Sequence, residues 1–311
     1  MKITTILCTY NRHQSLTAAL ESIARQRLPE TTEWEVIVVD NNSTDQTREV
    51  AEEFCCTYPG RFRYVFEPRP GKSYALNTGI REAKGDVLAF MDDDVTLEAD
   101  WLQNLTAALG GDEWVGSGGR VLPERMPSMP RWIPVQDRYG LAPLALFDLG
   151  SEGAPLTESP FGTNMAFKRE MFTKYGGFRT DLGPQPGSEI RGEDTEFGLR
   201  LLRAGERLRY EPSAIVYHAV PKNRLQKRYF LSWWFDKARS EVRVAGSELK
   251  AQPAVGGIPL TMLRRLAVWT VRWTFALEPA YRFSCKLKVW GKLGEIAEFH
   301  RRSRAGRWQV G

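Results

Sequence analysis

Short apolar runs alternate with segments of helical periodicity through the first third of this chain. The segment 14–26 carries Leu16, Ala19, Leu20 and Ile23, whose spacing is typical of one face of a helix. Strands are predicted at 3–8, 35–39, 61–66 and 86–91, and helices at 14–26, in the stretch ending at Phe54, and at 73–83. This alternation is typical of βαβ units. The sequence therefore predicts an α/β fold with a single, mostly parallel central sheet flanked by helices.

Three consecutive carboxylates follow the fourth apolar run. Asp92, Asp93 and Asp94 come directly after the run 87–90, so we expect them at the carboxyl end of a buried strand. Open α/β sheets bind ligands at that edge. Crowded carboxylates repel each other, and a divalent cation between them makes the arrangement favourable. The alternative is an acidic turn that caps the following helix.

The second half of the chain is less regular. The segment 123–160 is rich in Pro and Gly without a sustained period, which predicts long loops around an acceptor cleft. Regular structure is expected again at 164–172, in a helix at 194–204, and in a short strand at 214–217 that ends at His218.

The composition is that of a globular protein, but the charge is unevenly distributed. The 311 residues are 42% hydrophobic and carry a net charge of +5. Residues 222–311 contain 19 Lys+Arg and 6 Asp+Glu, a net charge of +13, which leaves −8 for residues 1–221. The four cysteines show no metal-binding or disulfide spacing, and the first residues offer no secretion signal, so we expect reduced thiols in a cytosolic protein.

The basic tail interleaves positive and aromatic residues. Between residues 262 and 293, Lys and Arg interrupt every window long enough to span a membrane. The pattern predicts amphipathic helices at an anionic membrane surface, with Lys and Arg near headgroups and Trp and Tyr at the interface. The alternative is a basic helical pair packed on the core.

Several short motifs together resemble family 2 glycosyltransferases of the GT-A fold. They are Thr9–Arg12, Val38–Ser43, Gly71–Ile80, Met91–Asp94, Phe161–Phe167, Gly176–Phe178 and Gly192–Asp194. The resemblance covers approximately residues 3–220. It implies a GT-A catalytic domain at 1–220, with a nucleotide-sugar-binding half at 1–110 and an acceptor half at 111–220. Residues 221–311 are then a basic, Trp-rich helical tail that docks on a membrane.

The resemblance implies an activated sugar nucleotide as the donor, most simply a UDP-sugar. Thr9 would line the base pocket and Asp40 would accept hydrogen bonds from the base, although Asp40 is also suited to capping a helix. Lys72 would lie near the nucleotide, or else be an exposed lysine on a turn. Asp92 and Asp93 are further candidates for donor binding.

The resemblance also implies a metal site that holds Mg²⁺ or Mn²⁺. Asp92 and Asp94 match the Asp-x-Asp motif of the family, with Asp94 as the more direct ligand. His218 is a further candidate ligand, with an ordinary structural role as the alternative, and an imidazole ligand would favour Mn²⁺ over Mg²⁺.

Glu193 and Asp194 begin a predicted helix, where the helix dipole favours ionised carboxylates. The resemblance implies that Asp194 is the general base of an inverting transfer and that Glu193 orients the acceptor or the metal site. Simple helix capping is the alternative.

These features predict a metal-dependent inverting glycosyltransferase on the cytoplasmic face of the cell membrane, with a glycan or lipid-linked acceptor and no nucleic-acid partner. The processive members' Gln-x-x-Arg-Trp motif is absent, since the chain reads Gln226-Lys227-Arg228-Tyr229-Phe230, which favours single transfers. A sugar nucleotidyltransferase would need a Gly-rich loop where Thr9–Arg12 stand. A non-catalytic, membrane-associated nucleotide-sugar-binding scaffold is the alternative from another class.

Overall fold

The computed structural model describes residues 1–134, 141–188, 190–245, 254–255 and 258–305. These residues form two compact units. The first unit comprises Met1–Arg125, Leu146–Pro186 and Glu193–Ala219, and the second comprises Met126–Ala145, Gly187–Gly192 and Val220–Gly311. Every residue singled out above as a candidate site residue belongs to the first unit.

The first unit is built on a single mixed sheet, to which nine strands contribute in the described part of the chain. The strands are β1 (Lys2–Thr9), β2 (Glu33–Asp40), β3 (Phe62–Phe66), β4 (Val87–Asp92), β5 (Val95–Leu97), β6 (Gly116–Pro123), β7 (Ala154–Pro155), β8 (Asn164–Lys168) and β9 (Leu208–His218). Their order is β3-β2-β1-β4-β8-β6-β9-β5, with β7 paired to β9. The β3-β2-β1-β4 half is parallel, as the alternating pattern predicts, whereas β8 runs antiparallel to both β4 and β6.

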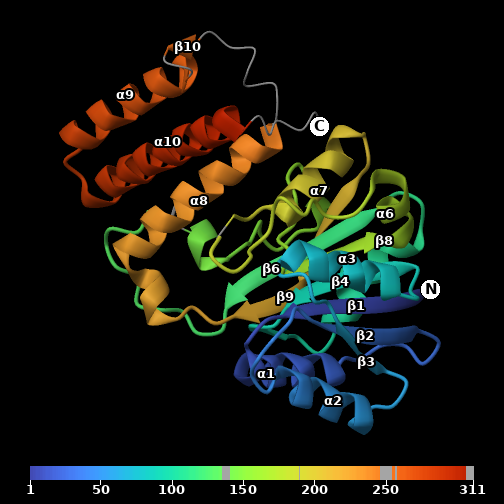
Figure 1. Ribbon diagram of the computed structural model, residues 1–311. Helices are drawn as coiled ribbons and strands as arrows, with labels where there is room; N and C mark the ends of the chain where they lie inside the picture. The colour runs from blue at the N-terminus through green and yellow to red at the C-terminus, as the bar shows by residue number, and fades with distance from the viewer. Residues whose placement is uncertain (135–140, 189, 246–253, 256–257, 306–311) are drawn as a thin grey trace. The chain divides into compact units, whose positions relative to one another are not determined.

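Helices cover both faces of the parallel half. The helices of this unit are α1 (His13–Ala24), α2 (Thr47–Thr57), α3 (Lys72–Glu82), α4 (Trp101–Thr106), α6 (Arg169–Tyr175) and α7 (Glu193–Arg203). Right-handed crossovers place α1 and α2 on one face of the sheet and α3 on the other (Figure 1). The four apolar residues predicted to form one side of α1 are all fully buried.

The register of the strands brings distant residues to one edge. Thr9 pairs with Asp40 across β1 and β2, and Cys8 pairs with Asp92 across β1 and β4. His218, the last residue of β9, pairs with Val95 of β5. We call this the carboxyl edge, because β1, β2, β4 and β9 all end there.

Asn164 joins the two halves of the sheet from a fully buried position at the start of β8. Its amide nitrogen donates to the backbone carbonyls of Arg120 and Ala214, both at 2.8 Å, and its oxygen accepts from the indole of Trp101 at 2.8 Å. One side chain therefore ties β8 to β6, β9 and α4. This gives a structural reason for the asparagine in the motif Phe161–Phe167.

The structure differs from the predicted elements in four places. Sequence patterns did not identify β5, α4 or β6, and β9 begins at Leu208 rather than at 214. The β6–β9 ladder contains an irregularity at Gly119/Arg120, opposite the residues around Pro212. Within 123–160, the described residues contain a short 3-10 helix at Ala142–Leu144 and the two-residue strand β7, and 135–140 lie outside the described residues.

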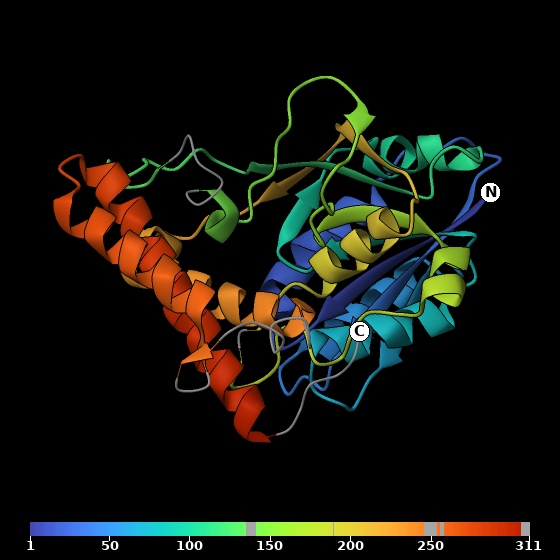
Figure 2. The same ribbon diagram turned by 90° about the horizontal axis from the view of Figure 1, so that it is seen from above.

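The second unit is helical, as predicted for the tail. It contains a 3-10 turn at Lys222–Leu225, the helices α8 (Lys227–Ala245), α9 (Leu260–Phe275) and α10 (Pro279–Ala305), and the paired strands β10 (Ala254–Val255) and β11 (Ile258–Pro259). Helices α9 and α10 lie side by side, joined by a short turn (Figures 1 and 2). None of the described helices is both long and apolar enough to cross a membrane.

A buried ion cluster holds α8 to α10. Glu298 of α10 is fully buried and accepts from the guanidinium groups of Arg239 at 3.2 Å and Arg243 at 2.9 Å. Arg301 pairs with the same carboxylate. Burial raises the pKa of Glu298, but hydrogen bonds and charge from Arg301 and Arg243 outweigh it and lower the pKa to about 2. Part of the tail's positive charge therefore serves the packing of the second unit.

Gly79 allows α3 to lie directly on β1. A Cβ atom at this position would stand 2.5 Å from Cγ2 of Ile6 and 3.2 Å from Cγ2 of Val39. We predict that Gly79→Ala lowers the free energy of unfolding by about 1–3 kcal/mol, because the buried Ile6 side chain must shift. Urea denaturation measures the change. Gly111→Ala is the control, since nothing lies within 4 Å of that Cβ. Equal stability of the two variants would contradict the close packing.

Candidate functional site

The acidic run forms the turn between two strands. Asp92 ends β4, Asp93 and Asp94 form the turn, and β5 begins at Val95. The helix α4 starts only at Trp101, so the interpretation of this run as a helix cap is wrong. The three carboxylates instead lie together at the carboxyl edge.

Arg12 supplies positive charge to this turn. Its Nη1 atom lies 3.2 Å from Oδ1 of Asp93 and 2.7 Å from Oδ2 of Asp94. Burial raises the pKa of Asp93 to about 6, against the opposing influence of Arg12. Burial lowers the pKa of Arg12, but the two carboxylates outweigh it and leave that pKa raised. Sequence reasoning assigned no role to Arg12, although it stands in the motif Thr9–Arg12.

Lys72 links the acidic turn to the start of α7. Its Nζ atom lies 2.5 Å from Oδ1 of Asp92 and 3.9 Å from Oε1 of Glu193. Burial lowers the pKa of Lys72, but the charges of these carboxylates outweigh it and hold the pKa above its ordinary value. The interpretation of Lys72 as an exposed lysine on a turn is therefore wrong.

The backbone around Lys72 is positioned from two sides. Asn41, which follows β2, accepts from the backbone N–H of Gly71 at 2.8 Å and donates to the carbonyl of Arg69 at 2.7 Å. The N–H of Lys72 donates to the carbonyl of Pro184 at 2.9 Å. Gly71 has φ +133°, which a side chain rarely adopts. These constraints explain the glycine that precedes Lys72 in the motif.

Glu193 and Asp194 form the first turn of α7. Glu193 is only 4% exposed, and its pKa is raised to about 7 by burial and by the charge of Asp194, with Lys72 opposing. Asp194 accepts from the N–H of Gly162 at 2.8 Å through Oδ2 and from the N–H of Thr195 at 2.6 Å through Oδ1. Asp194 thus satisfies a donor of its own helix as well as one from the segment before β8.

Gly162 leaves room for that carboxylate. A Cβ atom at position 162 would lie 2.8 Å from Oδ2 of Asp194 and 3.2 Å from its Cβ. The glycine in the motif Phe161–Phe167 therefore sets the orientation of the Asp194 side chain. A sequence pattern alone does not reveal this contact, because it joins residues that are 32 positions apart.

Asp40 lies at the end of β2 and is almost fully buried. It accepts from the hydroxyl of Tyr64 at 2.9 Å and from the N–H of Ser43 at 2.9 Å. Asp40 does not cap α2, because Asp45 accepts from the first residue of that helix, Thr47, at 3.1 Å. Sequence reasoning missed Tyr64. Thr9 lies beside Asp40 in the β1–β2 ladder.

His218 reaches the acidic turn from β9. Its Nε2 atom lies 3.7 Å from Oδ2 of Asp94, and the residue is 3% exposed. The structure therefore brings together Asp92, Asp94 and His218 at one edge, through their contacts with Lys72, Arg12 and each other.

Two of these residues offer donor atoms to a metal ion. Among the described residues, no three His, Cys, Asp or Glu side chains are grouped so that they could hold one. Asp94 and His218 nevertheless offer an oxygen and a nitrogen donor side by side, which suits Mn²⁺ or Mg²⁺. Both Asp92 and Asp94 are neutralised by cationic side chains of the protein. A metal ion at this position would take over part of that role.

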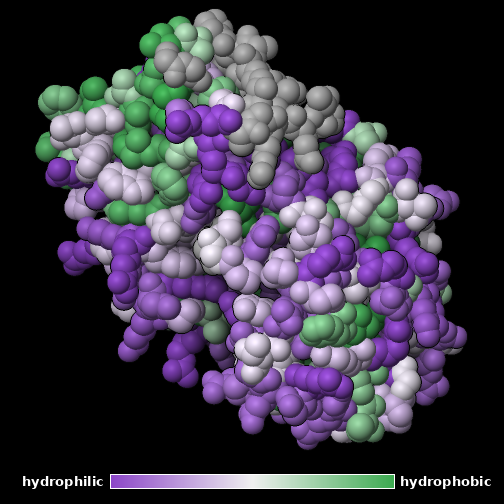
Figure 3. Space-filling view, viewed as in Figure 1, coloured by the Kyte–Doolittle hydropathy of each residue, from purple (hydrophilic) through white to green (hydrophobic). Residues whose placement is uncertain are grey.

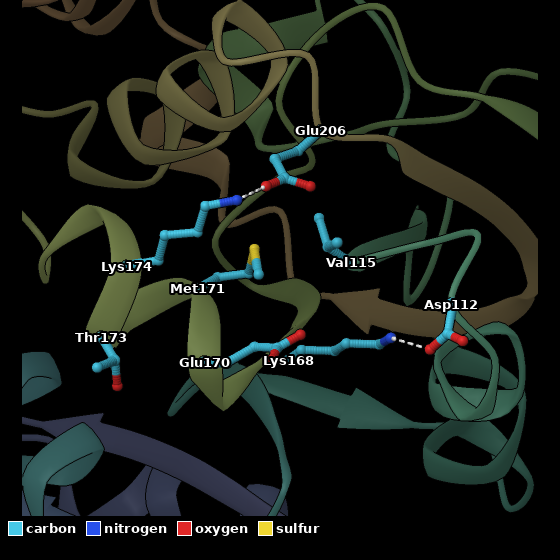
Figure 4. A pocket seen from close by; sticks show the side chains of 8 residues that line it. All are labelled: Asp112, Val115, Lys168, Glu170, Met171, Thr173, Lys174 and Glu206. Carbon is cyan, nitrogen blue, oxygen red and sulfur yellow. Dashed lines mark hydrogen bonds and ion pairs between the residues drawn. The ribbon is translucent and has the colours of Figure 1, made fainter.

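A cavity of about 490 Å³ lies elsewhere in the first unit (Figure 4). Lys168, Lys174 and Glu206 are among the residues that line it. Lys168 pairs with Val87, the first residue of β4, so the cavity belongs to the edge opposite Asp92. Figure 4 shows Lys174 joined to Glu206, at 2.8 Å. The cavity is therefore distinct from the cluster of charged residues at the carboxyl edge.

Comparison with known proteins finds family models and relatives that match most of the chain. The family model described as glycosyl transferase family 2 matches residues 4–176, and that of glycosyl transferase family group 2 matches residues 145–287. The succinoglycan biosynthesis protein ExoM of Rhizobium meliloti is 31% identical over 232 residues, which cover 73% of this chain and 71% of that protein. A glucosyl-dolichyl phosphate glucuronosyltransferase of Haloferax volcanii is 29% identical over 240 residues, 75% of each chain.

Solved structures support the same fold. The mannosyltransferase PcManGT from Pyrobaculum calidifontis, in complex with GDP-Man and Mn²⁺, superposes with a TM-score of 0.59 at 25% identity, over 98% of this chain and 76% of that one. The first 349 residues of S. aureus TarS in complex with UDP give a TM-score of 0.53 at 16% identity, over 100% of this chain and 93% of that one, which shows likeness of fold. With its GT-A fold and matching motifs, the chain belongs to glycosyl transferase family 2 and is a glycosyltransferase.

Proposed function

We propose that this glycosyltransferase moves a sugar from a nucleotide-sugar donor to an acceptor hydroxyl, with inversion at the anomeric carbon. The observation that carries the proposal is the position of Lys72 between Asp92 and Glu193. This lysine connects the residues expected to hold the donor diphosphate with those expected to face the acceptor. In this proposal, 1–110 is the donor half and 111–220 is the acceptor half.

The donor half holds the nucleotide through the ends of β1, β2 and β4. Asp40 and Thr9 contact the base, while Lys72, Asp92 and Asp93 lie toward the ribose and diphosphate. Asp92, Asp94 and His218 are the residues that would hold a divalent cation, which would supply positive charge to the leaving diphosphate. Lys72 adds a fixed positive charge at the same place, since its raised pKa keeps it protonated.

Asp194 performs the proton transfer. Its carboxylate takes the proton of the acceptor hydroxyl, the acceptor oxygen forms a bond to the anomeric carbon, and the bond to the nucleoside diphosphate breaks with its electron pair on the leaving oxygen. A single displacement of this kind inverts the configuration. The N–H groups of Gly162 and Thr195 hold the carboxylate in place, and Glu193 orients the acceptor.

We further propose a UDP-linked donor and a glycan or lipid-linked acceptor on the cytoplasmic face of the cell membrane. One relative is a succinoglycan biosynthesis protein and another is a glucosyl-dolichyl phosphate glucuronosyltransferase, which supports a surface polysaccharide or glycolipid product. Similar structures contain UDP in one case and GDP-Man in another, so a donor panel should include both nucleotides. A non-catalytic scaffold would bind the nucleotide but turn over no donor in this panel.

The first prediction of this proposed function concerns the general base, Asp194. We expect Asp194→Asn to lower kcat by about 10²–10⁴-fold, because the amide cannot accept the proton, while nucleotide affinity stays within about twofold. Donor turnover and calorimetric titration with UDP and GDP measure the two quantities. The matched control is Asp112→Asn, a fully exposed residue of the same unit. A kcat close to that of the control would rule out Asp194 as the base.

The second prediction concerns the metal ion. We expect transfer to require Mn²⁺ or Mg²⁺ and to fall by about 100-fold or more in EDTA, since the leaving diphosphate then lacks its counter-charge. Asp94→Ala should cause a similar loss at saturating metal, whereas Asp112→Ala should not. Full activity of the native enzyme in EDTA would contradict metal dependence.

The third prediction concerns the cost of burying Glu193. Its folded pKa of about 7 lies above its ordinary value of 4.5, so the folded state binds this proton more tightly than the unfolded state does. Ionising Glu193 therefore destabilises the fold as pH rises from about 4.5 through 7, and the contribution vanishes at lower pH. We expect Glu193→Gln to raise the free energy of unfolding by about 1–3 kcal/mol at pH 8 relative to native, and by much less at pH 4.5.

Urea denaturation of both proteins in EDTA at the two pH values tests this expectation. Glu206→Gln is a suitable comparison, because hydrogen bonds from Lys174 and Tyr175 lower the pKa of Glu206, and its replacement should destabilise at pH 8. A Glu193→Gln variant that is less stable than native at pH 8 would show that the Lys72 contact outweighs the burial.

A further inference from the structure

Helix α9 packs against α10 through its tryptophans. The rings of Trp273 and Trp290 meet at 6.0 Å in an edge-to-face arrangement. Nζ of Lys288 lies 4.2 Å from the ring centre of Trp269, and Nζ of Lys286 lies 5.3 Å from that of Trp273. These aromatic and cation–π contacts hold the helix pair together. Both tryptophans of α9 thus take part in packing within the second unit.

A different face of α9 is exposed and apolar. Val268, Val271 and Phe275 follow one another at helical spacing, and Phe275 is 79% exposed. Leu277, in the turn to α10, is 96% exposed. Figure 3 shows hydrophobic side chains gathered on the surface where Figure 1 places α9. Contiguous exposed apolar surface of this kind marks an interaction site.

Positive charge accompanies this face. Arg264, Arg265 and Arg272 of α9 are exposed, and the sequence from Leu260 to Leu277 contains no acidic residue. The next acidic residue, Glu278, is engaged at the start of α10, where its carboxylate accepts from the N–H of Ala280 at 2.9 Å. Among these arginines Arg265 also feels the charge of Glu295 on α10. Docking through this face would therefore place a net positive surface of α9 against the partner.

We infer that the outer face of α9 docks on the surface of an anionic phospholipid bilayer, with Phe275 and Leu277 entering the boundary between headgroups and acyl chains. This inference deepens the membrane contact of the proposed function and rests on it. Charge complementarity favours lipid: anionic headgroups attract the arginines, whereas a second copy of the same face would bring like charges together. The lipid-facing residues are thus aliphatic and Phe side chains rather than the tryptophans that sequence analysis placed at the interface.

Vesicle flotation of the full chain tests the inference. The probes are phosphatidylcholine vesicles with and without 30% phosphatidylglycerol, at low and at physiological salt. We expect the protein to float with the anionic vesicles, to bind neutral vesicles weakly, and to bind less as salt increases. The double variant Phe275→Ser/Leu277→Ser should reduce partitioning about tenfold or more, because two large apolar groups are lost from the interface.

Met126→Ser is the matched control, since Met126 is 72% exposed in the same unit and lies outside α9. The double variant Arg264→Gln/Arg265→Gln should weaken binding to anionic vesicles and leave binding to neutral vesicles unchanged. Equal binding of the Phe275→Ser/Leu277→Ser variant and native protein would overturn the inference. So would sedimentation of native protein as a dimer that this variant dissociates, because a second copy would then cover the face.

Donor turnover measured without vesicles separates the two proposals. Vesicle binding with no turnover of any donor would leave the docking face standing and defeat the proposed function. If both proposals are correct, the Phe275→Ser/Leu277→Ser variant loses vesicle binding but retains donor turnover in solution.

Discussion

Charge balance at the carboxyl edge is the constraint on which the rest of the site depends. Asp92, Asp93, Asp94, Glu193 and Asp194 converge there, and burial makes their mutual repulsion costly. Two cationic side chains from different parts of the chain offset this repulsion. Lys72 lies against Asp92, and Arg12 lies against Asp93 and Asp94. Arg12 stands just after β1 and Lys72 begins α3 after β3, so the parallel strands determine where both cations lie.

The positions of those loops are set by residues without charge. Asn41 fixes the backbone before Lys72, and Asn164 ties β8 to its neighbours and to α4. Gly79 brings α3 onto β1, and Gly162 admits the carboxylate of Asp194. Most residues of the short motifs in this chain therefore serve to position a few ionised side chains. Their spacing along the chain reflects which strand ends meet.

Sequence patterns predicted the parallel half of the sheet, because its strands are apolar runs and its helices carry a clear stripe such as that of α1. They also predicted that Asp92 would stand at a strand end. The patterns missed β6, because it begins with glycines and a serine and shows no alternation of apolar residues. They also predicted too short a β9, because Pro212 interrupts its strand pattern. The ion pairs of Arg12 were missed because they join residues 81 and 82 positions apart, which only the β1–β4 register brings together.

The glycine at 162 has a consequence for judging which relatives of this protein are active. A homologue can retain every carboxylate of the carboxyl edge and still fail if a bulkier residue at this position pushes the proposed base aside. Loss of activity would then arise without the loss of any ionisable group. An inventory of acidic residues would class such a protein as an enzyme, and a calorimeter would find its nucleotide affinity intact. The distinction between an enzyme and a binding scaffold in this fold can therefore depend on the absence of a single methyl group.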